Sequence, residues 1–589
     1  MLPGMSRRSR WRWFLLVPLL AGAGWLAASL WPEPPPVAQQ RTMPLPADLA
    51  ARCEQFSPRV EEAADGVFVA IGYDLASTIL IRTSAGNVVV DPGMSPERAA
   101  AARDALLARA PGRVLALIYT HSHIDHVGGA RAWLADDPQI WATDAFPAHF
   151  LKQYGSLRPA ESRRGEHQFG RSVGAELLPC SALGPRPDLE HAGATGARMP
   201  THTFSGAQVL TFGDTTIELH EAHGETHDHL FVWLPQRGAL LPGDNYYAAF
   251  PNLYTIRGTS PRPVRAWIAS LDHMRRLAPE HLIPSHTLPL RGRAEIAQAL
   301  TDYRDAIAWV RAEVLRGANA GLDVDALAAR IGLPAALADR PALLELYGQI
   351  DWSVRAMYSA ELGWFDERPE QLYPPTDRAA RELALMGGPA AVLREAAAAE
   401  ADDDPRWALH LLGKLRDAPT ALTPAQHEDH RAATARVLRA LGERTHNTNG
   451  RAYLLEAAVR THTEVPAMAI AVDDGLLAGL PLDLFFETMT TRLIPGRAGP
   501  AHESIAIFFK DTDDRYTVTV RRGVAEVAHG APLPGTPPPL ARVTTDSTTW
   551  KRLALQQDSA AWALLGDRLD VDGSLLDLRR FLAYFQRGA

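Results

Sequence analysis

The chain has 589 residues, of which 46% are hydrophobic and 22% charged, and this ordinary globular composition excludes a disordered or collagen-like protein. At roughly 100–200 residues per domain, its length predicts about three or four domains. The 60 basic and 68 acidic residues give a net charge of −8, which argues against a general nucleic-acid binder. Two cysteines are too few for a disulfide scaffold or a structural zinc ribbon, whereas the 21 histidines are unusual.

The first 40 residues predict an export segment followed by a stiff spacer. Four arginines between residues 7 and 12 precede an uncharged apolar stretch at 13–31, and a proline-rich piece follows at 32–36. This pattern favours a transmembrane anchor, with a cleaved signal peptide as the alternative. The remaining chain is then expected in the periplasm or on the outer face of the inner membrane, or secreted after cleavage. There Cys53 and Cys180 could pair, although two free thiols fit equally well.

Residues 41–294 predict one mixed α/β domain. Short apolar segments separated by glycine- and asparagine-containing turns are typical of strands, and the alanine-rich segment 97–109 is typical of a helix. The segment 114–119 is entirely apolar and predicts a buried strand. The predicted strands are 66–71, 78–82, 87–90, 114–119, 208–212, 216–220, 230–234, 239–241 and 282–283.

Two further domains are expected after residue 294. Residues 295–465 are rich in alanine and leucine with helical periodicity, which predicts an all-α domain for packing or oligomerisation. Residues 466–589 return to an α/β pattern. The predicted helices of the first are 295–316, 324–331, 342–360, 378–386, 389–400, 407–416 and 427–441. The second is expected to hold strands at 504–509, 516–521 and 541–544 and helices at 548–556 and 575–585.

A dense group of metal-ligand residue types follows the predicted strand 114–119. His121, His123, Asp125 and His126 fall within six residues. Because alternate residues of an extended loop point to one side, His121 and His123 are expected to face one ion, and Asp125 and His126 another. Neutral imidazole and carboxylate ligands suit zinc. A solvated histidine-rich turn is the alternative.

Three more candidate ligands lie at the tips of later predicted strands. His229 precedes the strand 230–234, Asp244 follows 239–241, and His286 follows 282–283. One such residue alone would more often be structural, but the repetition at strand ends favours a metal site. Asp91 also ends a strand, and we expect it to accept a hydrogen bond that orients a histidine ligand.

The order of these residues resembles the metallo-β-lactamase superfamily, whose α/β fold is an αββα sandwich with two zinc ions between its sheets. The resemblance implies that a hydroxide shared by both ions is the nucleophile, since zinc lowers the pKa of bound water to about 7. It also implies the ligands: a first zinc held by His121, His123 and His229, and a second held by Asp125, His126 and His286, with Asp244 bridging.

Longer stretches are similar to bacterial alkyl sulfatases. They are 53–91, the segment FPNLYTIRG at 250–258, and the strings LGWFD at 362–366 and LMGG at 385–388. The helical domain resembles the dimerisation domain of this family, which implies a homodimer. The last domain resembles the sterol-carrier-protein-like domain that ends these enzymes and encloses an apolar tunnel. The resemblance implies hydrolysis of an amphiphilic alkyl sulfate to alcohol and sulfate.

The chain departs from this family at two metal positions. Alkyl sulfatases usually carry glutamates where His229 and Asp244 stand, whereas Glu225 matches a family glutamate and is expected to support the ligands from behind. This departure leaves open another hydrolase of the same fold, an esterase, lactonase or thioesterase for an apolar substrate. A lipid-binding protein is the third alternative, and the complete ligand set argues against it.

An alkyl sulfate carries an anionic head on an apolar chain, so its site needs a cation. Arg257 is the candidate sulfate clamp, because a guanidinium can bind two sulfate oxygens at once. Asn252 and Thr255 are weaker candidates for contacts to the same group. Asp125 and Arg257 are the predicted catalytic residues. The net charge of −8 does not attract an anion, so zinc and Arg257 would have to do so locally.

Overall fold

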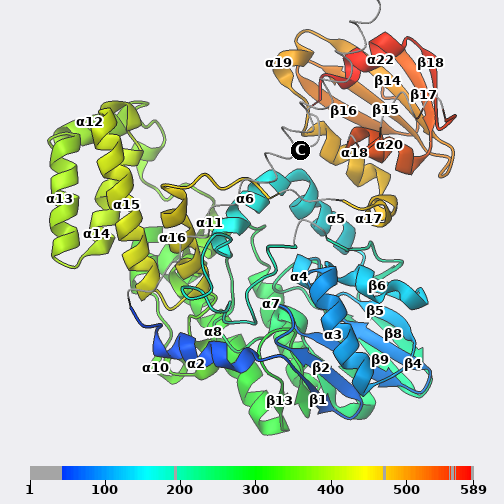
Figure 1. Ribbon diagram of the computed structural model, residues 1–589, viewed down its shortest axis with the longest axis horizontal. Helices are drawn as coiled ribbons and strands as arrows, with labels where there is room; N and C mark the ends of the chain where they lie inside the picture. The colour runs from blue at the N-terminus through cyan, green and yellow to red at the C-terminus, as the bar shows by residue number, and fades with distance from the viewer. Residues whose placement is uncertain are drawn as a thin grey trace, which may run out of the picture.

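The computed structural model describes residues 43–191, 195–468, 472–555, 557–558, 563 and 566–585. Three parts follow one another along the chain: a sandwich of two sheets, a group of helices, and a five-stranded sheet with its own helices (Figure 1). The predicted order of an α/β sandwich, an all-α region and a smaller α+β region is confirmed.

The first sheet has seven strands in chain order, antiparallel from β1 to β4 and parallel from β4 to β7. Successive side chains of a strand point to opposite faces. In β2, Val67, Val69 and Ile71 therefore face the second sheet, whereas Phe68 and Ala70 face the outer helix. The strands are β1 (Arg59–Ala64), β2 (Val67–Ile71), β3 (Thr78–Thr83), β4 (Gly86–Val90), β5 (Val114–Ile118), β6 (Gln139–Thr143) and β7 (His202–Phe204).

The second sheet has six strands in the order β13-β12-β11-β10-β9-β8, and among these the pair β11 and β12 is parallel. Apolar side chains of both sheets, such as Val88 and Ile118 of the first and Leu219 and Val232 of the second, share one buried core. The strands are β8 (Ala207–Phe212), β9 (Thr215–Glu221), β10 (Leu230–Leu234), β11 (Ala239–Leu241), β12 (His281–Leu282) and β13 (Leu290–Arg291).

Helices cover the outer face of each sheet. Helix α3 (Pro96–Arg109) packs on the first sheet, and it begins where the Ser95 side chain accepts a hydrogen bond from the Arg98 amide. Helices α7 (Val264–Arg276) and α8 (Arg293–Asn319) pack on the second sheet. The result is the predicted αββα arrangement. The shorter helical segments of this part of the chain include α2 (Ala47–Cys53), α4 (Ile124–Val127), α5 (Phe146–Leu151), the turn Lys152–Ser156 and α6 (Arg158–Gln168).

The middle region is helical, as predicted, with one displaced boundary. The helix expected at 342–360 begins only at Ile350, because the backbone of Leu344 and Gly348 hydrogen-bonds to Phe250 instead. Helix α16 was not predicted, and it packs against α6. The helices are α9 (Val324–Arg330), α10 (Ala335–Ala338), α11 (Ile350–Leu362), α12 (Arg378–Leu385), α13 (Pro389–Ala401), α14 (Pro405–Arg416), α15 (Pro424–Arg444) and α16 (Thr448–Arg460).

The last region is built on a sheet of order β16-β15-β14-β17-β18, with its own buried core. The pair β14 and β17 is parallel, and the other neighbours are antiparallel. Its strands are β14 (His502–Phe509), β15 (Arg515–Arg521), β16 (Val524–His529), β17 (Pro539–Thr545) and β18 (Leu569–Gly573). Its helices include α17 (Asp474–Gly479), α18 (Leu482–Thr490), α19 (Pro495–Ala498), α20 (Ser547–Ala554) and α22 (Leu575–Leu582).

The transmembrane assignment needs correction. Among the residues that the structure describes, no helix is long and apolar enough to cross a membrane. The apolar stretch 13–31, on which the anchor and the signal peptide were both predicted, lies outside the described residues. Of the two alternatives for the cysteines, the structure shows the paired one. Cys53 and Cys180 form a disulfide that links α2 to a loop 127 residues further along the chain.

Candidate metal centre

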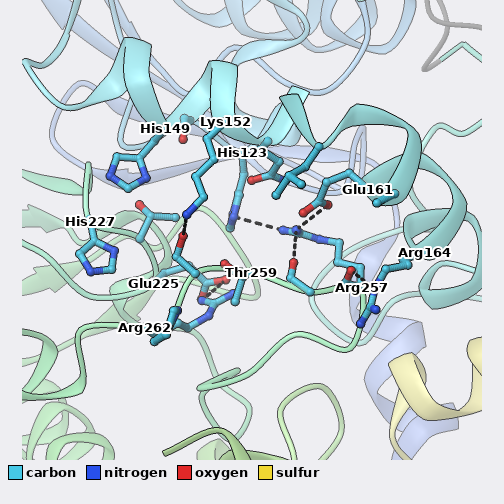
Figure 2. Close-up of a pocket in the computed structure, with 18 residues that line it drawn as sticks. His123, His149, Lys152, Glu161, Arg164, Glu225, His227, Arg257, Thr259 and Arg262 are labelled. Atoms are coloured by element: carbon cyan, nitrogen blue, oxygen red, sulfur yellow. Dashed lines mark hydrogen bonds and ion pairs between the residues drawn. The ribbon is translucent and has the colours of Figure 1, made fainter. Parts of the chain in front are cut away.

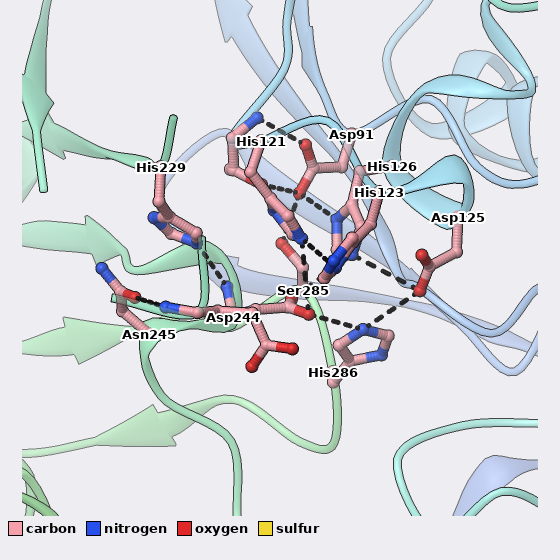
Figure 3. A network of polar contacts seen from close by, with 12 residues as sticks. Asp91, His121, His123, Asp125, His126, His229, Asp244, Asn245, Ser285 and His286 are labelled. Carbon is pink, nitrogen blue, oxygen red and sulfur yellow. Dashed lines mark hydrogen bonds and ion pairs between the residues drawn. The ribbon is translucent and has the colours of Figure 1, made fainter. Parts of the chain in front are cut away.

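The seven predicted ligands meet at one edge of the sandwich, where strands of both sheets end (Figure 3). Four of them follow β5, on a loop and on α4. The other three directly precede β10, lie in the turn Gly243–Asn245 after β11, and follow β12. Their positions at strand ends had predicted that these residues would meet, although they come from distant parts of the chain. They are His121, His123, Asp125, His126, His229, Asp244 and His286.

Six of the seven form two groups of three, and the ligand atoms of each group lie within 4.8 Å of one another. The groups are His121, His123 and Asp244, and Asp125, His126 and His286. The Asp244 carboxylate lies 3.8 Å from Nε2 of His121, 3.4 Å from Nε2 of His126 and 3.2 Å from Nε2 of His286. Its carboxylate thus lies within reach of both groups, and its role as a bridging ligand stays a prediction.

The atoms of this site fit a bound cation. Nε2 of His126 and Oδ1 of Asp244 are buried, and neither has a hydrogen-bond partner among the described residues. Buried polar atoms without partners are costly, and a cation bound between these two would satisfy both of them. The set of imidazole nitrogens and carboxylate oxygens is one that zinc accepts.

Nearby charges shift the pKa values of His286 and His123 in opposite directions. Burial lowers the pKa of His286, but the carboxylates of Asp244 and Asp125 outweigh this effect and raise the pKa to about 10. Burial lowers the pKa of His123 well below its usual value, and the nearby Arg257 guanidinium lowers it further. The His286 side therefore attracts a positive charge, whereas His123 stays neutral and keeps a lone pair for a metal.

Asp91 supports the site from behind, at the end of β4. Its Oδ2 accepts hydrogen bonds from Nδ1 of His126 at 2.8 Å and from the Ser285 hydroxyl at 2.6 Å. The Thr120 amide and hydroxyl each donate to the same carboxylate at 2.9 Å. Because Nδ1 of His126 is held by Asp91, Nε2 is the nitrogen that faces the metal group.

His229 lies against the first group without belonging to it. Its ring stacks on His121 with 4.9 Å between centroids, and its Nε2 accepts a hydrogen bond from the Asp244 amide at 3.0 Å. Gly243 has a φ of +56°, and a Cβ there would come within 2.7 Å of the His229 ring. The close approach of this turn therefore requires glycine. The role of His229 as a zinc ligand stays a prediction.

Glu225 lies in a buried ion pair. Its Oε1 is 2.5 Å from Nη1 of Arg262, and its Oε2 accepts a hydrogen bond from the Tyr247 hydroxyl at 3.4 Å. Burial raises the pKa of Glu225, although Arg262 opposes this effect. Glu225 belongs to neither metal group, and its role in supporting the ligands stays a prediction.

Arg257 reaches the metal centre from the loop before α7 (Figure 2). Its Nη2 lies 3.2 Å from Nε2 of His123, and its Nη1 lies 3.3 Å from Oε2 of Glu161. Glu161 comes from α6 and holds the guanidinium in place. The other ring nitrogen of His123, Nδ1, lies on the opposite side and is 2.8 Å from Nε2 of His121. A cation therefore stands directly beside the first metal group.

The two weaker candidates, Asn252 and Thr255, lie in the same loop as Arg257. The Thr255 hydroxyl donates to Oε1 of Gln168 at 2.8 Å, and the Arg257 amide donates to the same oxygen at 2.7 Å. The backbone N–H of Asn252 donates a hydrogen bond to the Tyr247 hydroxyl at 2.7 Å. Neither Asn252 nor Thr255 lines the two cavities at the site. These contacts shape the loop that carries Arg257, and a direct role in substrate binding stays a prediction.

Two cavities meet at His123 and Arg257. One has a volume of about 170 Å³ and is largely apolar, and the other has about 430 Å³ and is lined by basic side chains. The apolar cavity runs toward the C-terminal region, whose α17 closes part of its wall. Its apolar lining includes Leu75, Met94, Ile124, Phe150, Tyr154, Phe169, Val472, Leu476 and Leu480. The basic lining of the polar cavity is Lys152, Arg164, Arg257 and Arg262.

Sequence patterns missed several residues that shape these cavities. Glu161 and Lys152 lie on a helical segment with no metal-like motif, and Leu476 lies about 350 residues after the ligand cluster. Arg262 had a local signal that was available: it follows Arg257 by five residues in the same polar loop. The others had none, because only the packing of α5, α6 and α17 brings them to the site.

Three family models match the chain: the metallo-β-lactamase superfamily over residues 71–286, the alkyl sulfatase dimerisation domain over 323–464, and the alkyl sulfatase C-terminal domain over 471–589. A linear primary-alkylsulfatase from a Pseudomonas species is 30% identical over 529 residues, which are 86% of this chain and 98% of that protein. This chain belongs to the alkylsulfatase family. An (R)-specific secondary-alkylsulfatase from Pseudomonas is 29% identical over 77% of this alkylsulfatase and 70% of its own length.

The likeness extends to the whole fold. The stereoselective inverting sec-alkylsulfatase Pisa1 from Pseudomonas matches this alkylsulfatase with a TM-score of 0.84 and 25% identity, over 94% of this chain and 88% of that chain. The family resemblance found in the sequence is thereby confirmed, and so is the αββα sandwich with its two following regions.

Proposed function

We propose that this alkylsulfatase hydrolyses amphiphilic alkyl sulfates to an alcohol and sulfate. The main support for this proposal is that an apolar cavity and a basic cavity meet at Arg257, beside the two metal groups. An alkyl sulfate divides in the same way, into an apolar chain and an anionic head. The relatives named as primary and secondary alkylsulfatases support this substrate class.

We infer that the two ligand groups would hold two zinc ions, and that the Asp244 carboxylate would serve as a ligand to both. Bound zinc supplies Lewis acidity and lowers the pKa of water to about 7. The protein's own part is orientation: Asp91 fixes His126, and Glu161 fixes Arg257. The Arg257 guanidinium donates to the sulfate oxygens, and the apolar cavity receives the alkyl chain. Because the net charge of −8 does not attract an anion, this local cation and the bound zinc would have to do so.

Release of sulfate from dodecyl sulfate by the zinc-loaded protein tests this function. We expect sulfate release with the native protein and none above background with His121→Ala or Asp244→Ala, while far-UV circular dichroism shows an unchanged fold. His410→Ala, an exposed histidine on α14, is the matched control and should retain full activity. Brisk cleavage of esters or lactones without sulfate release would refute the proposal.

We further propose that the protein forms a homodimer and is exported. The matched dimerisation domain supports the dimer, as do exposed apolar side chains from the end of α11 to the end of α12: Trp364 is 69%, Tyr373 91% and Leu385 89% exposed. The disulfide between Cys53 and Cys180 supports export, because such bonds persist in oxidising compartments such as the periplasm.

A further inference from the structure

Helix α17 lies between the catalytic sandwich and the C-terminal sheet (Figure 1). Two leucines of this segment line the apolar cavity: Leu476 within the helix and Leu480 directly after it. The alkyl chain of the proposed substrate would therefore meet a wall that belongs to the C-terminal region. The contacts that hold α17 in place also set the shape of this part of the cavity.

The N-terminal end of α17 is fixed to the catalytic sandwich by Asp473. The Asp473 carboxylate accepts a hydrogen bond from the Leu476 amide at 2.9 Å and so caps the helix. The same carboxylate lies 2.8 Å from Nη1 of Arg198 and 3.2 Å from Nη1 of Arg131. Two arginines from the catalytic part of the chain therefore hold the first turn of α17.

Two glycines let α17 lie close against the catalytic part of the chain. Gly475 and Gly479 are four residues apart and therefore share one face of the helix. A Cβ added at Gly475 would lie 2.6 Å from the Arg198 guanidinium, and one added at Gly479 would lie 2.9 Å from Cβ of Met199. A larger residue on this face would push α17 away from its neighbours.

The C-terminal end of α17 is held by a buried lysine of the C-terminal region. Lys551, on α20, is only 1% exposed, and its ammonium donates to the carbonyl of Leu480 at 2.6 Å and to that of Ala478 at 3.4 Å. The last carbonyls of a helix have no partners within it and carry partial negative charge. A buried ammonium is costly unless its donors are satisfied, so Lys551 stays bound to these carbonyls.

We propose that Lys551 is a positioning residue for alkyl-chain specificity. It fixes the end of α17 opposite to Asp473, and it binds the backbone of Leu480, which itself lines the apolar cavity. Lys551 thereby sets the position of the wall formed by Leu476 and Leu480, and hence the chain lengths that the cavity binds well. The inference rests on the proposed function and deepens it.

Binding of alkanesulfonates tests this role without turnover, because a sulfonate has no ester bond to hydrolyse. Calorimetric titration of the zinc-loaded full chain should show that Lys551→Met binds decane-1-sulfonate about tenfold more weakly than the native protein, since about two methylene groups lose contact with the wall. Butane-1-sulfonate presents little chain to this wall, and both proteins should bind it with the same affinity. Unchanged binding of decane-1-sulfonate by folded Lys551→Met overturns the proposal.

Arg552→Met is the matched control. Arg552 follows Lys551 on α20, and its contact with α17 is an exposed ion pair with Asp474 at 3.4 Å, which contributes little to stability. This variant should bind both sulfonates like the native protein. A loss as large as that of Lys551→Met would show that the effect does not depend on the buried lysine, and it would overturn the proposal.

Two further variants protect the test from misfolding, because Lys551 is buried. Lys551→Gln keeps a neutral donor for the carbonyls and should weaken decane-1-sulfonate binding about threefold, since fewer methylene contacts are lost. Gly479→Ala retains Lys551 but displaces α17 from its other side, so it should cause the same chain-dependent loss. Gly496→Ala, on α19 with open space around it, is the control and should change nothing. Native-like binding by Lys551→Gln or by Gly479→Ala contradicts the proposal.

Turnover then separates positioning from a merely structural role. Lys551→Met should raise KM for dodecyl sulfate about tenfold and leave kcat within about twofold, whereas both constants should stay unchanged for butyl sulfate. A merely structural role would lower kcat for both substrates by the same factor, through loss of folded enzyme, and that result would overturn the proposal. Absence of sulfate release from every alkyl sulfate would refute the proposed function and leave the sulfonate result intact.

Discussion

Two buried aspartates at strand ends, Asp91 and Asp244, have different roles because their carboxylate oxygens have different hydrogen-bond partners. Asp91 accepts four hydrogen bonds, from Thr120, His126 and Ser285, so its lone pairs are already used. Oδ1 of Asp244 has no partner among the described residues and faces Nε2 of His126 at 3.4 Å. The first therefore orients a ligand, and the second has a free oxygen for a metal.

Removal of the Arg257 guanidinium should separate sulfate esters from neutral esters. Arg257→Ala is expected to lower kcat/KM for dodecyl sulfate by about 100-fold or more, mainly through KM, because about 3 kcal/mol of charge-assisted hydrogen bonding is lost. A neutral dodecyl ester should change less than tenfold. Steady-state kinetics with both substrates measure this difference. Arg163→Ala, an exposed arginine outside both cavities, is the control, and equal losses on both substrates would exclude the clamp.

Zinc affinity should rise with pH between 7 and 10. In the metal-free protein the pKa of His286 is raised to about 10, so at pH 7 its imidazole carries a proton that zinc must displace. Each pH unit toward 10 should therefore strengthen zinc binding, by up to about tenfold for this proton. Calorimetry in buffers of different ionisation enthalpy counts the protons released. Binding that releases no proton at pH 7 would contradict the charge state of His286.

At the scale of elements, the apolar cavity is built by helices from two distant parts of the chain. Phe150 and Tyr154 come from α5 and the following turn, and Leu476 comes from α17 of the C-terminal region. Leu476, Leu477 and Leu480 also share a buried core with the first sheet, so α17 packs on the catalytic sandwich. The C-terminal region thus contributes to the wall that would contact the alkyl chain.

A change in α17 should therefore alter chain-length preference. Leu476→Ala removes apolar wall and should lower kcat/KM for dodecyl sulfate about fivefold, or about 1 kcal/mol, with little effect on butyl sulfate. Leu477→Ala on the same helix is the matched control, since Leu477 is buried without lining the cavity. Kinetics over a series of chain lengths provide the measurement. An equal effect of both variants would mean that α17 acts only through stability.

At the scale of the whole molecule, the exposed apolar side chains from the end of α11 to the end of α12 predict where two copies meet. Leu385→Glu replaces one of them with a charge and should convert the proposed dimer to monomers, since a buried unpaired charge costs on the order of several kcal/mol. Sedimentation velocity reports the change in mass. Leu533→Glu, on an exposed loop of the C-terminal region, should leave the dimer intact. A Leu385→Glu dimer of unchanged stability would place the interface elsewhere.

Local patterns were sufficient for much of the fold and for the choice of ligands. The strand predicted at 230–234 matches β10, and the one at 239–241 matches β11, because buried strands read as short apolar runs. His121, His123, Asp125 and His126 were recognisable because they lie within six residues. Helix α16 was missed because its first turn contains threonine, asparagine and glycine, which are poor helix formers, and its tertiary contacts with α6 compensate.

The sequence by itself determined the order of the three regions and the residues available to bind metal, because both depend on chain order and local periodicity. Only the tertiary structure decided how they are used. It placed Asp244 between the two ligand groups, set Glu161 beside Arg257, and paired buried Arg262 with Glu225. These relations join residues from 37 to 123 positions apart and arise from the packing of sheets and helices, which no local pattern records.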